Sequence, residues 1–126
     1  KSYCCFYSNA RDFARIGKLY LNKGNWNGTQ IVPEKFVEES IKPADLLAEA
    51  GGKIDHFGYA WWILPNYKNH NIFYARGILG QYIFVIPEKK LIVVRLGKKR
   101  GTKVGEHYTD VYKYIDEVLK MYPDPA

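Results

Sequence analysis

The sequence has no long hydrophobic run, so we expect no transmembrane segment. Its longest apolar stretches fall far short of the ~20 residues that a bilayer crossing needs, and no basic, apolar and small-residue series marks a signal peptide. Internal repeats and low-complexity segments are also missing. With 47% hydrophobic and 25% charged residues among 126, the composition predicts one folded domain rather than a disordered or multidomain chain.

Cysteine is scarce, and the usual metal-binding spacings are absent. Cys4 and Cys5 are the only two cysteines, and adjacent residues are a poor arrangement for a structural disulfide. No Cys-x-x-Cys or His-x-His motif occurs, and His56, His70 and His107 lie far apart in the chain. We therefore expect turn and surface histidines and no metal site. A glycine-rich phosphate loop before a helix is missing as well.

Acidic residues are outnumbered, with 13 Asp and Glu against 19 Lys and Arg. The net charge of +6 gives a general preference for anionic partners but does not define a function. The densest basic stretch is Lys98-Lys99-Arg100 with Lys103, between glycines. A solvated loop is the favoured interpretation, and a patch for phosphate or anionic glycan is the alternative.

Two apolar runs, residues 82–86 and 91–94, flank a turn that begins at Pro87. Both runs are apolar on both side-chain parities, which predicts a β-hairpin covered on both faces. The aromatic segment 57–65 predicts a third strand, and residues 66–71 a polar turn after it. We expect an antiparallel sheet of three to four strands.

Helices are predicted both before and after these strands along the chain. Ser8 or Asn9 caps the first, with Asp12 as a capping-box variant and residues 22–24 as its end. Asn27-Gly28 predicts a tight turn, and Pro33 begins a second helix that runs through residue 41. Residues 44–50 could add one helical turn. Apolar residues at helical spacing in 108–122 predict a terminal helix packed on the sheet.

Three segments resemble serine β-lactamase-like proteins, the superfamily of class C β-lactamases, penicillin-binding proteins, D-Ala-D-Ala peptidases and related esterases. They are Ala-Arg-Asp-Phe-Ala-Arg at 10–15 with its Asn-Gly turn, the aromatic strand at 57–65, and Gly77 with the Gly-Gln pair and hairpin that follow. The resemblance covers the C-terminal third of such proteins. It implies an α+β fold, part of a β-lactamase-like fold, in which residues 1–126 form a single domain and a C-terminal fragment of a longer chain. The start at Lys1 without Met agrees with that expectation.

The family mechanism is acyl transfer by a serine nucleophile within Ser-x-x-Lys, assisted by a Tyr. Ser2, Ser8 and Ser40 are the only serines, and none is followed by Lys at the third position. Tyr-x-Asn, the second family motif, occurs three times and is therefore unspecific. The resemblance implies that this chain alone is catalytically inert.

The third family motif carries the candidate site residues. The resemblance places Ala75 where a Lys or His usually contributes charge, Arg76 where a hydroxyl contacts the substrate carboxylate, and Gly77 at the shared glycine. Arg76 could bind a carboxylate bidentately or simply face solvent at the sheet edge. Ile78 aligns with the residue whose backbone N–H forms part of the oxyanion hole.

The favoured function is the C-terminal part of a serine β-lactamase-like hydrolase that acts on a β-lactam, a peptidoglycan peptide or an ester. Its partner would be a small acyl substrate, with no cofactor and no nucleic acid, and the resemblance suggests a periplasmic or exported location. The alternative is a non-catalytic binding module for an anionic partner such as cell-wall glycan or nucleic acid. We also expect self-association through the apolar strand from Leu91 to Leu96, because it should be a sheet edge.

Overall fold

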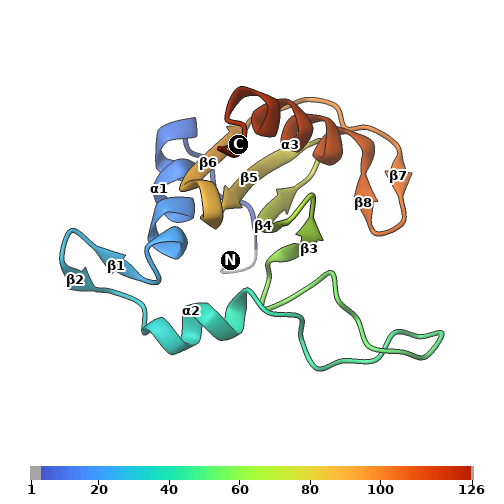
Figure 1. Cartoon of the computed structure of the whole chain (residues 1–126), viewed down its shortest axis with the longest axis horizontal. Helices are drawn as coiled ribbons and strands as arrows, with labels where there is room; N and C mark the ends of the chain where they lie inside the picture. Colours follow the sequence, from blue (N-terminus) through green and yellow to red (C-terminus); the bar gives the residue numbers. More distant parts are fainter. Residues whose placement is uncertain (1–3, 126) are drawn as a thin grey trace.

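A four-stranded antiparallel sheet organises the computed structural model, which describes residues 4–125. Its strands follow one another in sequence order as β3 (Trp62–Tyr67), β4 (His70–Gly77), β5 (Gln81–Ile86) and β6 (Leu91–Arg95). The 3-10 helix η1 (Pro87–Lys89) makes the turn between β5 and β6. Helices lie on both sides of the sheet (Figure 1). The predicted α+β class, with an antiparallel sheet and a C-terminal helix, is confirmed.

Helix α1 (Ala10–Leu21) covers one face of β5 and β6. Asn9 caps it as predicted, since its side chain accepts a hydrogen bond from the backbone N–H of Asp12. Gly17 allows the helix to come close: a Cβ there would lie 3.0 Å from methyl carbons of both Ile83 and Ile92. The absence of a side chain at this position therefore sets the distance between α1 and the sheet.

Helix α3 (Thr109–Met121) covers the opposite face. Val111 and Ile115 are buried there in a cluster with strand residues whose side chains point to this face. On β4 and β5 these are every second residue, and the set is Leu64, Ile72, Tyr74, Tyr82, Phe84 and Ile86. The intervening residues, such as Ile83 and Val85, point toward α1. Helices on both faces explain why the β5 and β6 sequences do not alternate between apolar and polar residues.

Smaller elements flank this core. Helix α2 (Glu34–Ser40) follows Pro33, and β1 (Asn25–Trp26) pairs with β2 (Thr29–Gln30) across the Asn27-Gly28 turn. A second small hairpin, β7 (Lys103–Val104) with β8 (His107–Tyr108), precedes α3 and was not predicted. Within residues 4–125, no helix combines the length and apolarity needed to cross a bilayer.

Two secondary-structure predictions need correction. Residues 44–50 form an irregular loop, in which the backbone N–H of Ala48 bonds Gly52 O, and not a helical turn. The third strand starts at Trp62 rather than near residue 57, because Ala60 has φ 63° and the segment folds back so that Phe57 bridges to Trp62. The amino-acid sequence does not reveal that a non-glycine residue such as Ala60 adopts a left-handed backbone conformation, so this turn could not be predicted.

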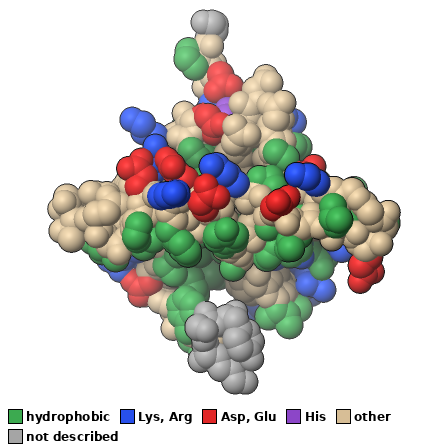
Figure 2. Space-filling model, turned by 90° about the horizontal axis from the view of Figure 1, so that it is seen from below, with side chains coloured by type: hydrophobic (Ala, Val, Ile, Leu, Met, Phe, Trp, Pro, Cys, Tyr) green, Lys and Arg blue, Asp and Glu red, His purple; other side chains and the backbone are tan. Residues whose placement is uncertain are grey.

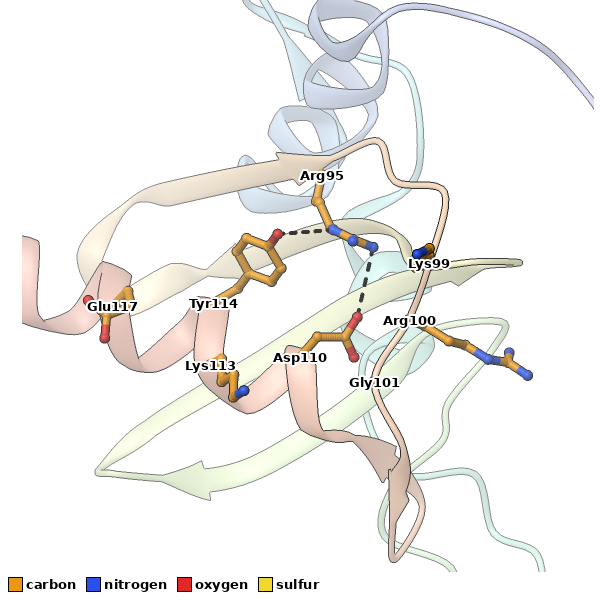
Figure 3. Close-up of a pocket in the computed structure, with 8 residues that line it drawn as sticks. All are labelled: Arg95, Lys99, Arg100, Gly101, Asp110, Lys113, Tyr114 and Glu117. Atoms are coloured by element: carbon orange, nitrogen blue, oxygen red, sulfur yellow. Dashed lines mark hydrogen bonds and ion pairs between the residues drawn. The ribbon is translucent and has the colours of Figure 1, made fainter.

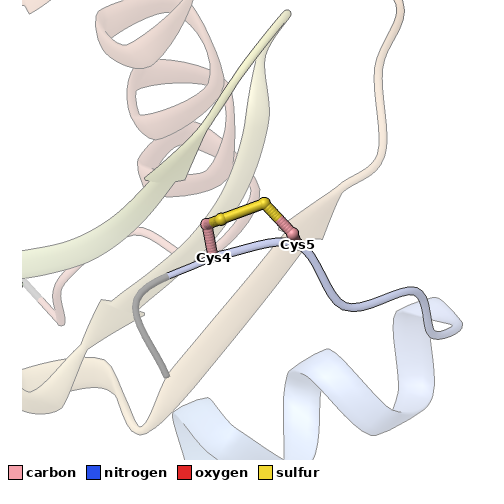
Figure 4. Close-up of a disulfide and its surroundings, with 2 residues drawn as sticks. All are labelled: Cys4 and Cys5. Carbon is pink, nitrogen blue, oxygen red and sulfur yellow. A yellow bond between two sulfur atoms is a disulfide. The ribbon is translucent and has the colours of Figure 1, made fainter. Parts of the chain in front are cut away.

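The cysteine and histidine predictions were also wrong. Cys4 and Cys5 form a disulfide between adjacent residues, with Cα atoms 3.7 Å apart and Cys5 at φ 77° (Figure 4). His70 and His107 are buried, with 4% and 6% of their surface exposed, rather than lying on turns or the surface. Aromatic and carboxylate partners from distant segments stabilise them there, and sequence spacing does not show such partners.

Apolar side chains remain exposed on the side of α2 and the adjoining loops. In the view from below, they lie beside a band of acidic and basic side chains (Figure 2). The large exposed apolar residues in this part of the sequence are Ile31, Phe36, Leu46, Leu47 and Tyr59. Contiguous apolar surface of this kind is typical of an interaction site.

Candidate active-site strand

The last three residues of β4 form an open sheet edge. Strand β3 begins opposite Tyr74, so Ala75, Arg76 and Gly77 pair with β5 only. The chain then turns through residues 78–80, with Leu79 at φ 59° and Gly80 at φ 82°. The Ile78 side chain is 76% exposed, and its backbone N–H donates no hydrogen bond within residues 4–125. This edge presents an unpaired backbone donor to an approaching group.

Successive side chains of this edge point to opposite faces. Ala75 packs against the cluster of Trp61, Phe73 and Val85 on the α1 face. Arg76 is half-buried on the α3 face, where its guanidinium carbon lies 3.2 Å from the centroid of the Trp62 ring. The structure therefore separates Arg76 from the face where Ala75 lies, although the two are neighbours in sequence.

The contacts of Arg76 fix its guanidinium. Besides stacking on Trp62, it lies 5.0 Å from the ring centroid of Tyr108 and donates a 2.9 Å hydrogen bond to the carbonyl of Glu106. His56 stacks on Trp62 with 6.1 Å between ring centroids. The positive charge is thus stabilised by aromatic faces and a backbone carbonyl, and no carboxylate within residues 4–125 forms an ion pair with it.

A buried pair, His107 and Tyr74, lies behind Arg76. The Tyr74 hydroxyl and His107 Nδ1 are 2.5 Å apart, and Tyr74 is fully buried. Burial, with a smaller contribution from the Arg76 charge, lowers the pKa of His107 to about 4. Burial also raises the pKa of Tyr74. Both groups are therefore neutral near pH 7, which fits their desolvated position beside a fixed cation.

The described serines have structural roles. The Ser40 hydroxyl is buried and donates to Phe36 O at 2.6 Å, and Ser8 donates to the Asp12 carboxylate. Ser2 lies outside the described residues.

Of the Tyr-x-Asn matches, Tyr67 donates to Asp116 at 2.8 Å, and burial and this partner raise its pKa to about 12. No group of three His, Cys, Asp or Glu side chains within residues 4–125 could bind a metal ion.

Sequence reasoning located the strand but not its surroundings. Residues 75–77 end strand β4 and pair with β5 only, and Ile78 begins the turn that follows. Trp62, His107 and Tyr108 were missed, because they reach this edge from β3 and from the unpredicted β7–β8 hairpin. Their only signal was an aromatic or imidazole side chain near a strand, which is common in a chain with 16% aromatic residues.

Comparison with known proteins supports the fold. A solved structure named "Putative 6-aminohexanoate-dimer hydrolase from Bacillus anthracis" is 31% identical in sequence, with a TM-score of 0.69 over 94% of this chain and 30% of that one. A curated protein of Alkalihalophilus pseudofirmus, "Uncharacterized protein BpOF4_21049", is 28% identical in an alignment of 127 positions that covers 90% of this chain and 36% of that protein. No family model matches. The chain thus spans about a third of the length of these relatives.

These similarities agree with the resemblance found in the sequence. The α+β arrangement is that of a β-lactamase-like hydrolase fold, and the structural neighbour carries the name of a hydrolase.

Proposed function

We propose that this chain is the C-terminal part of a serine hydrolase that transfers the acyl group of an amide or ester. Its role is to supply one wall of the active site, the open edge of β4 and the turn that follows. The nucleophile and the base come from the remainder of the protein, because Ser-x-x-Lys is absent from the 126 residues. A chain that spans about a third of its relatives is consistent with that division of roles.

The observation that carries this proposal is the unpaired N–H of Ile78. It lies in an exposed turn at the end of the strand that resembles the third family motif. A backbone N–H at such a site stabilises the negative charge that develops on the carbonyl oxygen during acyl transfer. The role needs no particular side chain, so it is compatible with Ala75 and Arg76 in place of the usual motif residues.

Arg76 is proposed to favour substrates that carry a carboxylate. Its guanidinium is fixed on Trp62 and uses one terminal nitrogen for Glu106 O, which leaves further N–H groups for an anion. The structural neighbour is named for 6-aminohexanoate dimer, a linear amide that ends in a carboxylate. A small linear amide or ester with a carboxylate end is therefore the substrate class proposed here.

A pair of substitutions at Ile78 in the longer protein that contains this chain tests the oxyanion role. Ile78→Ala keeps the N–H and should leave kcat for a p-nitrophenyl ester within about twofold, since the side chain is exposed. Ile78→Pro removes the N–H and should lower kcat by roughly 10²–10³-fold. Equal activity of the two variants, at matched melting temperature, would show that this N–H does not stabilise the reaction.

A further inference from the structure

The turn that carries the Ile78 N–H is not held by apolar packing. Ile78 and Leu79 are 76% and 47% exposed, so burial contributes little to the conformation of residues 78–80. Leu79 has φ 59°, a left-handed conformation that costs free energy at a non-glycine residue. Polar contacts must therefore fix this turn, and two long side chains supply them.

Gln81, the first residue of β5, reaches back over the turn. Its Nε2 donates to the carbonyl of Ile78 at 3.1 Å and also to the carbonyl of Gly97. Its Oε1 accepts a 2.9 Å hydrogen bond from the backbone N–H of Gly97. The amide of Gln81 thus connects the turn to the segment that leaves β6, and both of its polar atoms are in use.

Arg95, the last residue of β6, holds the other half of the turn. Its Nη1 donates to Gly80 O at 2.5 Å and lies 3.4 Å from Leu79 O. The guanidinium lies between two glycines: a Cβ would come within 1.8 Å of Nη1 at Gly80 and within 2.2 Å at Gly97. The space around this side chain therefore depends on glycine at both positions.

Helix α3 orients Arg95 from behind. Arg95 Nε donates to the Tyr114 hydroxyl at 3.1 Å, and Nη1 lies 3.8 Å from the Asp110 carboxylate, as the dashed lines in Figure 3 show. Asp110 is oriented in turn by the Tyr82 hydroxyl, which donates to it at 3.1 Å. The chain of contacts runs from α3 through Arg95 to the turn, and burial raises the pKa of Tyr82, so its hydroxyl stays a donor.

We propose that Gln81 and Arg95 are positioning residues. They hold the turn of residues 78–80 in one conformation, so that the Ile78 N–H keeps a fixed position and direction. This inference rests on the oxyanion role proposed above. Catalytic hydrogen-bond donors must be held within about 0.5 Å of the productive geometry, and supporting side chains with fixed hydrogen bonds provide that precision. Loss of either side chain leaves the N–H present but mobile.

The test uses the longer protein that contains this chain, with a p-nitrophenyl ester as substrate. Gln81→Met and Arg95→Met should each lower kcat by ~10–100-fold while KM changes by less than about threefold, because the donor is misplaced and not the substrate. Arg95→Lys keeps the charge and one contact and should recover part of kcat. Lys99→Met is the matched control. Lys99 lines, together with Arg95, the pocket of about 320 Å³ drawn in Figure 3, but it donates to none of the turn carbonyls, so its loss should leave kcat unchanged.

The outcomes separate this inference from the proposed function. If Ile78→Pro lowers kcat but Gln81→Met and Arg95→Met match the unaltered protein, the positioning role is wrong and the oxyanion role stands. If Ile78→Pro has no effect, both are wrong. Because the two positioning residues belong to different strands, one variant remains informative if the other fails to fold, and a thermal melt of each identifies that case.

Discussion

The buried pair of His107 and Tyr74 predicts a specific dependence of stability on pH. Burial and the nearby Arg76 charge lower the pKa of His107 to about 4 in the folded chain, whereas an unfolded histidine has a pKa of about 6.5. Between these two values the unfolded chain binds a proton that the folded chain does not. The free energy of unfolding therefore falls as the pH drops from 7 toward 4.

The size of the effect follows from the two pKa values. Relative to pH 7, His107 alone should reduce the free energy of unfolding by about 1.2 kcal/mol at pH 5.5 and about 2.4 kcal/mol at pH 4.5. With only 6% of His107 exposed, solvent screening reduces these figures little. For a typical domain stability of about 10 kcal/mol, they amount to roughly a tenth and a quarter of the total.

Urea unfolding followed by tryptophan fluorescence at several pH values measures this effect. His107→Asn puts an amide oxygen near the position of Nδ1, so it can keep a contact to Tyr74 without titrating, and its curve should be flatter by the amounts given above. Identical slopes for the unaltered chain and His107→Asn would refute the buried neutral histidine.

Two further predictions concern packing and assembly. Gly17→Val should lower the free energy of unfolding by about 1–3 kcal/mol, since a Cβ already reaches 3.0 Å from Ile83; urea unfolding measures this, and a loss below 0.5 kcal/mol would contradict the close approach. Strand β6 pairs only with β5 within the described residues, so we propose that the chain self-associates through this edge. Leu96→Lys, at a half-exposed position, should weaken this association, and sedimentation at several concentrations measures it. A monomer at every concentration with freely exchanging β6 amides would count against it.

Local signals predicted much of the fold. The Asn9 cap, the Asn27-Gly28 turn and the apolar stripe of α3 each depend on residues within one or two turns of chain, and the structure confirms all three. The hairpin of β5 and β6 was equally visible, because its runs are apolar on both parities.

The surroundings of the site depend on contacts between distant segments. Arg76 is fixed by Trp62 and Glu106, which lie 14 residues before it and 30 residues after it. Arg95 reaches the carbonyl of Gly80 only because two glycines make room for it. No period or motif encodes such pairs, so the sequence indicated the strand but not the side chains that surround and support it.

Covalent labelling of the longer protein tests the central claim most directly. Incubation with a chromogenic β-lactam or an activated ester, followed by intact-mass and peptide analysis, should find one acyl group on the serine of a Ser-x-x-Lys sequence outside residues 1–126. The 126-residue chain alone should stay unmodified and hydrolyse neither compound above background. No adduct on the longer protein, or an adduct within these 126 residues, would contradict the assignment as the C-terminal part of a serine hydrolase.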